Sequence, residues 1–471
     1  MDTDLVVIGA GAAGIGAAQT ARRRGASVAL VERGPIGGDC TFTGCIPSKT
    51  LLDGASRGES FDAAMAAVRT AVETVAATES APVLRKEGID VIEGSASFTD
   101  RLTLTVDGKP IRAKSIVLAT GASPAVPPIP GLESVPYLTN ENIFELASLP
   151  RSLAILGGGP IGVEMAEAFA RLGSKVTIVE GASQLLPREE PLAAEVIASA
   201  FSRLGIAQRT GSAVSSVEHG ALGSGVTLRL ADGSSVEADQ LLVAVGRRPA
   251  TSNLGLDAAG VDVDARGFVT VDSRLRTSAK GIFAAGDVAE ALQFTHVAYQ
   301  TGRIAATNAL SHLPTHRFRS ASVPWVTFTS PEVARVGMTE AEAAPRGGRV
   351  VFVPMTEVDR AITTRQTEGF VKIIAGPRPL LRNVAGGRIL GATIVAPRAG
   401  EMLHEIVLAM QAGMFPARLA LTVHAYPTWS MAIQQAAAQL FGEFGGRTAR
   451  MASTTSDDAT LGSAADKVEQ E

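Results

Sequence analysis

The stretch DLVVIGAGAAGIGAAQTARRRGASVALVE, residues 4–32, decides the fold that this sequence predicts. It contains, in order, an apolar strand, a glycine turn, a helix, a second strand and an acid: 4–8, Gly9-x-Gly11-x-x-Gly14, 15–24, 27–31 and Glu32. In such a turn the glycines let the backbone approach a pyrophosphate, and the helix N-terminus holds the phosphate charge. The acid accepts a hydrogen bond from a ribose hydroxyl. The stretch therefore predicts a dinucleotide-binding unit.

The same order of elements returns once, further along the chain. Its parts are 153–156, Gly157-x-Gly159-x-x-Gly162, a helix through Arg171, 175–179 and Glu180. In both copies the acid follows the last glycine of the turn by 18 residues. One such glycine motif is a weak signal, but two in the same structural context with correctly spaced acids are a strong one. We predict two dinucleotide sites, the first for FAD and the second for a nicotinamide, and we assign Gly246 to the second.

Two further segments favour FAD in the first site. The apolar segment SIVLATGASP closes on a turn at Thr120 and Gly121. The segment GIFAAGD ends in Gly286 and Asp287, where a carboxylate could accept hydrogen bonds from a ribityl chain. Each segment alone is equally well explained by ordinary packing of a strand against a turn. Together and in this order they indicate a flavin site.

The chain has only two cysteines, Cys40 and Cys45, in the run GGDCTFTGCIPSKT. A C-x4-C pair can close a small disulfide, and the residues after Cys45 indicate the start of a helix, whose N-terminus lowers the pKa of a thiol. Zinc wants about four ligands, and no second cysteine pair or nearby histidine completes such a set. A structural disulfide is disfavoured in a chain without export features. We predict a catalytic dithiol and no metal site.

Composition limits the remaining classes of function. The length of 471 residues suggests about three domains at ~150 residues each. A formal net charge of −4 provides no basic surface for nucleic acid. The N-terminal segment leaves no room for a signal peptide, and no run of about 18 apolar residues predicts a membrane span. We therefore expect a cytoplasmic enzyme.

These motifs identify a resemblance. From about 1 to 445, the chain resembles the flavoprotein disulfide reductases, the class I pyridine nucleotide-disulfide oxidoreductases that include dihydrolipoamide dehydrogenase, glutathione reductase and mercuric reductase. GGDCTFTGCIPSK matches the redox-disulfide motif of that family, and GIFAAGD matches its second FAD motif. The resemblance implies that Cys45 is the charge-transfer thiol beside the flavin and that Cys40 is the interchange thiol. It also implies that Lys49 lies near flavin N5 and pairs with Glu164.

The resemblance implies an α/β fold with two Rossmann-like dinucleotide-binding domains, for FAD and NAD(P), and an α+β C-terminal dimerisation domain. The expected FAD domain is discontinuous, at 1–150 and 275–320, and it encloses an NAD(P) domain at 151–274. An interface domain at 321–445 would form a homodimer. Its expected strands and helix are 323–329, 370–375, 389–396 and 400–413. The remaining residues, 446–471, are polar and predict a disordered tail.

The acid of the second motif bears on the choice of nicotinamide. Glu180 would accept a hydrogen bond from a free 2′-hydroxyl and repel a 2′-phosphate, which favours NADH. Arg188 lies a few residues further on and could reach a phosphate, so NADPH stays open. We predict NADH.

One segment departs from the family. Disulfide-exchanging members carry His-Pro-Thr followed by a glutamate, whereas here Tyr426 precedes Pro427-Thr428 and Met431 replaces the acid. Thiol exchange must move protons near neutral pH, and a tyrosine of pKa about 10 accepts them poorly. His424 is a possible substitute, because residues two apart in an extended segment point to one side. A structural role for His424 is equally consistent with the sequence.

The terminal electron acceptor stays open between three hypotheses. The chain is closest in pattern to dihydrolipoamide dehydrogenase, with electrons passing from nicotinamide to FAD, to the Cys40–Cys45 disulfide and on to a small disulfide. The alternative is a mercuric reductase-like enzyme that reduces a metal ion or a quinone, which the replacement by Tyr426 favours. A non-catalytic FAD-stabilised dimer is the third, and the retained dithiol argues against it.

Overall fold

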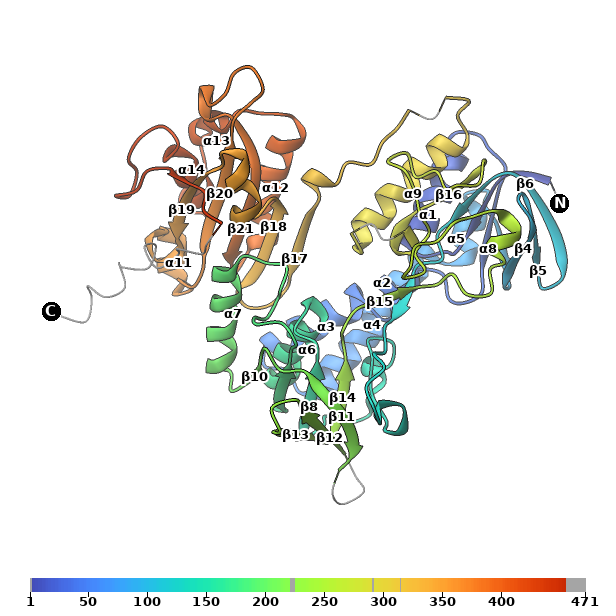
Figure 1. Cartoon of the computed structure of the whole chain (residues 1–471), viewed down its shortest axis with the longest axis horizontal. Helices are drawn as coiled ribbons and strands as arrows, with labels where there is room; N and C mark the ends of the chain where they lie inside the picture. Colours follow the sequence, from blue (N-terminus) through green and yellow to red (C-terminus); the bar gives the residue numbers. More distant parts are fainter. Residues whose placement is uncertain (1, 221–224, 290–291, 314, 455–471) are drawn as a thin grey trace. The chain divides into compact units, whose positions relative to one another are not determined.

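The computed structural model describes residues 2–220, 225–289, 292–313 and 315–454 (Figure 1). These residues form two compact units. Of the described residues, unit 1 comprises 2–157, 168–175 and those within 214–319, and unit 2 comprises 158–167, 176–213 and 320–454. The fold is mixed α/β, as the sequence predicts.

The main sheet of unit 1 has seven strands, in the order β3-β2-β1-β6-β5-β4 with β16 beside β6. Their bounds are Asp2–Ile8 (β1), Val28–Glu32 (β2), Asp90–Glu93 (β3), Ala96–Asp100 (β4), Thr103–Val106 (β5), Lys109–Leu118 (β6) and Ile282–Ala284 (β16). The pairs among β1, β2, β3, β6 and β16 are parallel, whereas β4 and β5 join in antiparallel fashion. Since the carboxyl ends of parallel strands meet at one edge of a sheet, the segments that follow β1, β6 and β16 come together there.

Side chains of β1 alternate between two hydrophobic clusters, one on each face of this sheet. Leu5 and Val7 belong to one cluster, and Val6 and Ile8 belong to the other. A strand that is buried on both faces needs a continuous apolar run, which this part of the sequence has. The strand predicted at 4–8 is therefore present and central.

Unit 1 also contains helices, of which α1, α5, α8 and α9 contact strands of the main sheet. Their bounds are Ala12–Arg23 (α1), Gly38–Phe42 (α2), Cys45–Ser56 (α3), Phe61–Glu79 (α4), Ala81–Lys86 (α5), Leu256–Ala259 (α8) and Thr295–Ala309 (α9). α1 and α9 pack closely, because glycines lie at their contact: a Cβ on Gly302 would lie 2.0 Å from the backbone oxygen of Ala13. This contact fixes the first residues of α9 relative to the glycine turn that begins α1.

Unit 1 also contains three smaller sets of strands. β7 (Ala122–Pro124) pairs with β15 (Arg247–Pro249) in antiparallel fashion, and β8 (Ser152–Leu156) pairs in parallel with β14 (Gln240–Val243). A three-stranded antiparallel sheet has the bounds Val214–His219 (β11), Val226–Leu230 (β12) and Ser235–Ala238 (β13). The β7–β15 pair brings the segment after β6 next to the segment after Gly246.

Unit 2 is built on a six-stranded antiparallel sheet in the order β17-β18-β21-β20-β19-β22. The strands are Pro324–Thr327 (β17), Glu332–Gly337 (β18), Arg349–Pro354 (β19), Phe370–Gly376 (β20), Arg388–Ala396 (β21) and Arg450–Met451 (β22). The helices are Pro160–Arg171 (α6, whose first residues belong here), Pro191–Arg203 (α7), Glu340–Ala343 (α10), Asp359–Thr364 (α11), Ala399–Gln411 (α12), Pro416–Leu421 (α13) and Met431–Ala438 (α14). A further strand, β9 (Lys175–Val179), pairs in parallel with β10 (Ala207–Arg209).

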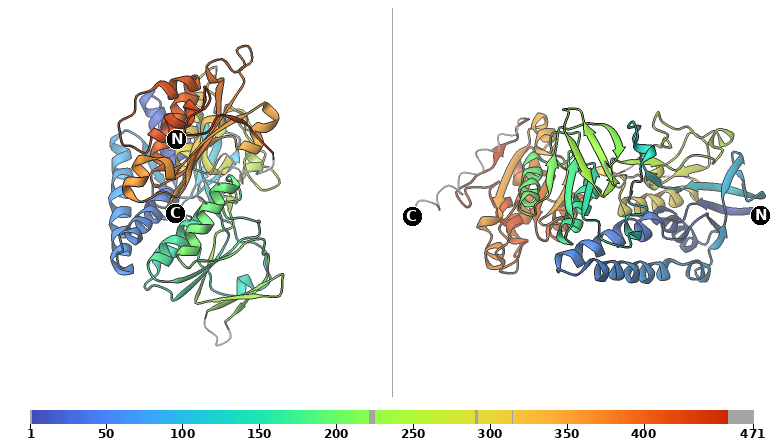
Figure 2. Two further views of the ribbon diagram at one scale, coloured as in Figure 1. Left: turned by 90° about the vertical axis from the view of Figure 1, so that its left-hand side faces the viewer. Right: turned by 90° about the horizontal axis from the view of Figure 1, so that it is seen from below.

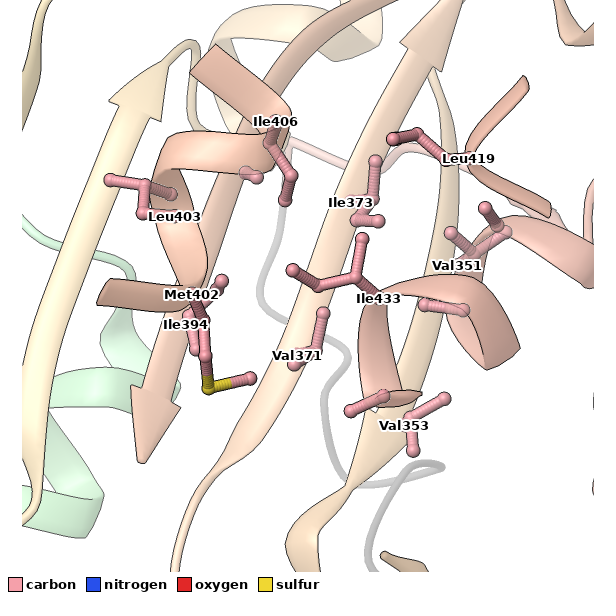
Figure 3. Packing of buried hydrophobic residues seen from close by; sticks show 14 of the residues in the cluster. Val351, Val353, Val371, Ile373, Ile394, Met402, Leu403, Ile406, Leu419 and Ile433 are labelled. Carbon is pink, nitrogen blue, oxygen red and sulfur yellow. The ribbon is translucent and has the colours of Figure 1, made fainter. Parts of the chain in front are cut away.

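One face of the six-stranded sheet holds the main core of unit 2. Val351, Val371 and Ile394 point from β19, β20 and β21 toward Met402 of α12 and Ile433 of α14 (Figure 3). Figure 2 shows the orange and red helices of this unit beside its strands from two further directions. The strands and the helix predicted in this region correspond to β17, β20, β21 and α12.

A buried cluster of charges joins several elements of unit 2. Lys372 on β20 is fully buried, and its Nζ lies 3.1 Å from a carboxylate oxygen of Glu340 and 3.5 Å from one of Glu190. Arg450 on β22 also pairs with Glu340. Burial favours the protonated acid, but the hydrogen bond from Arg450 and the charge of Lys372 hold the pKa of Glu340 below its ordinary value. The cluster therefore contains two carboxylates and two cations.

Two expectations about domain limits differ from what the structure contains. The segment 151–274, which we expected to form one domain, divides between unit 1 and unit 2 by its contacts. We expected a disordered tail from 446, but β22 lies within it and pairs with β19, because Arg450 finds a buried carboxylate to bind. The rest of the predicted tail, 455–471, lies outside the described residues. Within the described part of the chain, no helix is long and apolar enough to cross a membrane.

Candidate active site

The first glycine turn has the geometry that the sequence predicts. Gly9 has a φ of +101°, and a Cβ on Gly14 would lie 1.8 Å from the backbone oxygen of Gly9. Gly11 is the N-cap of α1. Glu32, at the end of β2, accepts a hydrogen bond of 2.6 Å from the backbone N–H of Ala10. The acid therefore lies against the turn at the carboxyl edge of the sheet.

The second glycine turn repeats this arrangement. Gly157 has a φ of +111° in unit 1. In unit 2, Glu180 follows β9 and accepts hydrogen bonds from the backbone N–H groups of Gly158 (2.6 Å) and Ala182 (2.7 Å). A carboxylate has about four acceptor positions, so Glu180 retains capacity for a ribose hydroxyl. No atom lies within 4 Å of the Cβ position of Gly159, which leaves space for a ligand to approach the backbone.

The segments that follow β6 and β16 supply further polar groups at the edge of the main sheet. The hydroxyl oxygen of Thr120 is buried and has no hydrogen-bond partner among the described residues. Gly121 has a φ of +72° with open space around its Cβ position, and the N–H of Gly286 donates to Thr301. An unsatisfied buried hydroxyl beside two glycine turns is what a bound dinucleotide would complete. The residues assigned to FAD therefore fit that group.

Asp287 follows β16 and lies among charged neighbours. Burial raises the pKa of Asp287, although the nearby guanidinium of Arg247 opposes that rise. The Nε of Arg247 lies 3.3 Å from a carboxylate oxygen of Asp287. Gly246, with a φ of +134° and open space at its Cβ position, immediately precedes this arginine.

The two cysteines lie side by side, as thiols, in unit 1. Cys40 belongs to α2, and Cys45 is the first residue of α3, as the sequence predicts. The hydrogen bond with Cys45 and burial raise the pKa of the Cys40 thiol well above its ordinary value. The Sγ of Cys45 lies 3.4 Å from the hydroxyl oxygen of Thr295, the first residue of α9. The hydroxyl of Thr295 acts on both sulfurs, because it also opposes the rise in the pKa of Cys40.

Polar residues around the dithiol were not found from the sequence. Thr41, which is almost fully buried, donates a hydrogen bond of 2.9 Å to Glu79 at the end of α4. The charge of Glu79 contributes to the raised pKa of Cys40. Asp39 precedes Cys40 and pairs with Arg247. Thr295, Glu79 and Arg247 are distant from the cysteines in sequence, so no local motif points to them.

Lys49 and Glu164 lie in different units, so the pair that the resemblance implies stays a prediction. Lys49 is one turn beyond Cys45 on α3 and shares its face of the helix. Glu164 is 4% exposed on α6 and accepts a hydrogen bond of 3.0 Å from the backbone N–H of Phe328. The carboxylate therefore has a defined position within unit 2.

The segment that replaces the family's histidine does not place His424 and Tyr426 together. The side chain of His424 is 7% exposed, with Nε2 3.0 Å from Glu405 and Nδ1 2.9 Å from the carbonyl oxygen of Thr422. Tyr426 is 70% exposed, and a hydrogen bond with Asp359 raises its pKa. The two side chains therefore have different partners, and the substitution of His424 for the family's histidine stays a prediction.

Other candidates take structural positions. Trp429 packs against the main core of unit 2. The side chain of Arg188 is exposed, and its carbonyl oxygen accepts a hydrogen bond from Arg335. Within the described ranges, no group of three or more His, Cys, Asp or Glu side chains could hold a metal ion.

Comparison with known proteins agrees with this arrangement. A family model described as pyridine nucleotide-disulphide oxidoreductase matches residues 3–302, and a model of the dimerisation domain of the same group matches residues 323–437. The chain is 36% identical to a mercuric reductase from Staphylococcus aureus over 433 residues, which cover 88% of this chain and 78% of the relative. It is 34% identical to a dihydrolipoyl dehydrogenase from Thermus scotoductus, covering 93% of this chain and 97% of the relative.

A solved structure is similar over nearly the whole chain. It is the Cu(II) complex of the HOCl-induced flavoprotein disulfide reductase RclA from Escherichia coli. The sequences are 34% identical, the TM-score is 0.83, and the match covers 93% of this chain and 99% of that one.

Proposed function

The chain belongs to the pyridine nucleotide-disulphide oxidoreductases, and from this premise we propose a role for each of its site residues. It is a flavoprotein oxidoreductase that uses FAD and NAD(P)H. FAD, when bound, would accept a hydride from the nicotinamide and pass two electrons on to the Cys40–Cys45 disulfide. The dimerisation domain supports a homodimer.

The residues that would hold the two cofactors are those of the two glycine turns and the further groups that the sequence predicts. For FAD they are Gly9, Gly11, Gly14, Glu32, Lys49, Thr120, Gly121, Gly286 and Asp287, and for the nicotinamide they are Gly157, Gly159, Gly162, Glu180 and Gly246. Glu180 supports NADH over NADPH, because a carboxylate beside the ribose repels a 2′-phosphate. A lower KM for NADH than for NADPH is the expected result, and the reverse order would contradict this assignment.

The contact between the two thiols at the start of α3 carries the proposal for the dithiol. Cys45 lies at a helix N-terminus, where a thiolate is stabilised, and Thr295 can donate a hydrogen bond to its sulfur. The hydrogen bond with Cys45, burial and the charge of Cys45 disfavour a thiolate at Cys40. This asymmetry supports Cys45 as the thiol that faces the flavin and Cys40 as the thiol that meets the acceptor.

The surroundings of Tyr426 and His424 favour a soft metal ion as the acceptor. Both ring nitrogens of His424 already have partners, and Tyr426 is bound to an acid that raises its pKa. Neither group is therefore well suited to accept a proton from Cys40. A thiol gives up its proton when it binds a soft metal, so this reaction does not depend on a nearby base. Two electrons from one nicotinamide reduce one Hg(II) to Hg(0) or two Cu(II) to Cu(I).

A small disulfide such as lipoamide is the second candidate. The complete dithiol and the similarity to a dihydrolipoyl dehydrogenase support it. The non-catalytic dimer is set aside, because the relatives are enzymes.

Turnover with Hg(II), Cu(II), lipoamide and a quinone tests the choice of acceptor. We expect metal-ion turnover in the wild type that Cys40→Ser abolishes. Tyr426→His should raise lipoamide turnover at least about tenfold, since a positioned acid–base group contributes ~10²–10⁴-fold. Tyr426→Phe, which only removes the hydroxyl, is the matched control. Wild-type turnover that is fast with lipoamide and absent with both metals would reject the metal-ion assignment.

A further inference from the structure

Asp39 connects the dithiol to a charged group at the edge of the main sheet. Its backbone oxygen accepts a hydrogen bond of 2.9 Å from the N–H of Thr43, and its Oδ1 lies 3.3 Å from the hydroxyl oxygen of the same threonine. Thr43 lies between the two cysteines in the sequence. The side chain of Asp39 therefore fixes the segment that sets the spacing of Cys40 and Cys45.

The second carboxylate oxygen of Asp39 binds Arg247. The Nη2 of this arginine donates to Asp39 and also to the carbonyl oxygen of Ala122, the latter at 2.6 Å. The Nε of Arg247 lies 3.3 Å from Asp287, and the side chains of Arg247 and Asp287 are only 15% and 18% exposed. One guanidinium is thus shared by two carboxylates, and the three groups together carry one negative charge.

This arrangement has a consequence for the dithiol. A segment held in one conformation keeps the two sulfurs in contact, which raises their effective concentration and favours the disulfide. Favouring the disulfide over the dithiol lowers the reduction potential of the pair.

We infer that Asp39 is a positioning residue that keeps the Cys40–Cys45 pair strongly reducing, through its contacts with Thr43 and Arg247. The inference rests on the proposed function, in which these cysteines form a reversible disulfide. A purely structural role for the Asp39–Arg247 pair would affect stability and FAD content and leave the potential unchanged. The two roles therefore make different predictions.

Redox equilibration of the FAD-containing protein with dithiothreitol tests the inference. In this exchange the protein disulfide takes two electrons and two protons from dithiothreitol, which closes to its own cyclic disulfide. The fraction of reduced Cys40 and Cys45 is read by alkylation and mass spectrometry. Asp39→Asn should move the equilibrium about tenfold toward the protein dithiol, which corresponds to ~30 mV for a two-electron couple.

Three other variants make this result specific. Asp39→Glu keeps the charge and should stay close to the wild type. Thr43→Val removes the hydroxyl contact and keeps the ion pair, so it should shift the equilibrium in the same direction by a smaller factor. Asp53→Asn, at an exposed acid on α3 that pairs with Arg57, is the matched control and should cause no shift.

The outcomes separate this inference from the proposed function. The inference is overturned if the wild type and Thr43→Val each show a reversible dithiol–disulfide equilibrium and the equilibrium constant of Asp39→Asn does not differ from that of Asp53→Asn. The proposed relay through the dithiol would still stand. Equal shifts in Asp39→Asn and Asp39→Glu, together with an equal loss of FAD, would also overturn the inference. If the wild-type cysteines form no reversible disulfide, the relay fails and this inference fails with it.

Discussion

Replacing Lys372 with methionine tests the physical basis of unit 2. The change keeps the length of an apolar side chain and removes a fully buried cation that lies 3.1 Å from Glu340 and 3.5 Å from Glu190. Glu340 retains Arg450 and the backbone N–H of Ser453. Glu190 retains the backbone N–H of Glu340 at 2.7 Å. Two buried carboxylates then share one cation.

The cost follows from this imbalance. Breaking a buried pair by removing one partner destabilises a protein by ~3–5 kcal/mol, and the remaining hydrogen bonds place this case near the lower limit, at ~3 kcal/mol. At ~2–4 °C per kcal/mol for a unit of this size, the unfolding transition of unit 2 should fall by ~6–12 °C. Differential scanning calorimetry of the FAD-containing protein measures this shift.

Two further variants test whether the loss of stability comes from removing the charge of Lys372. Lys175→Met, at an exposed lysine of unit 1 at the start of β9, should leave the transition of unit 2 within about 1 °C of the wild type, as surface substitutions do. Lys372→Met combined with Glu190→Gln restores the balance of charge and should recover at least half of the loss, because neutral replacement of a whole buried pair costs little. A decrease of less than ~2 °C in the melting temperature of Lys372→Met, or no recovery in the double variant, would refute the reasoning.

Two other predictions follow from the glycine turns and from Asp287. Gly14→Ala should abolish FAD retention, because its Cβ would lie 1.8 Å from the oxygen of Gly9, whereas Gly159→Ala, in open space, should retain FAD and raise the KM for NADH at least about fivefold; absorbance and steady-state kinetics distinguish them. Because burial raises the folded-state pKa of Asp287, its contribution to stability is complete below the unfolded pKa of about 3.9 and is lost as the pH rises through the folded value. The melting temperature of FAD-free Asp287→Asn, relative to that of the FAD-free wild type, should therefore increase as the pH rises from about 4 to about 7. A difference that stays constant with pH would contradict this assignment.

The sequence predicts those parts of the site that depend on local rules. Gly9 and Gly14 can be recognised because a positive φ and a close backbone approach each demand glycine at a fixed spacing. Cys45 at the start of a helix follows from the residues after it. Glu32 and Glu180 follow from the length of one strand–helix–strand unit.

Contacts between distant segments could not be predicted in this way. Arg247 binds Asp39 from a position 208 residues away, and no periodicity relates the two. Glu79 reaches Thr41 only because α4 ends beside the dithiol segment. For His424, the sequence suggested a rule for strands, but its side chain turns to Glu405 on α12 because the segment is irregular. In each case the tertiary structure decides the partner.

The electrostatic environment of Cys40 bears on which kind of electron acceptor the enzyme can use. Burial and the neighbouring Cys45 raise the pKa of the Cys40 thiol, and the hydrogen bond with Thr295 opposes that rise. Transfer of two electrons to the disulfide breaks the bond between Cys40 and Cys45, and a sulfur that is released as a neutral thiol must take up a proton. Attack on an acceptor requires a thiolate at Cys40, and the charge of Glu79, which is hydrogen-bonded to Thr41, disfavours that thiolate. A metal cation stabilises a thiolate at Cys40 through its positive charge, whereas a neutral disulfide does not. The electrostatics of unit 1 therefore favour a cationic acceptor independently of Tyr426.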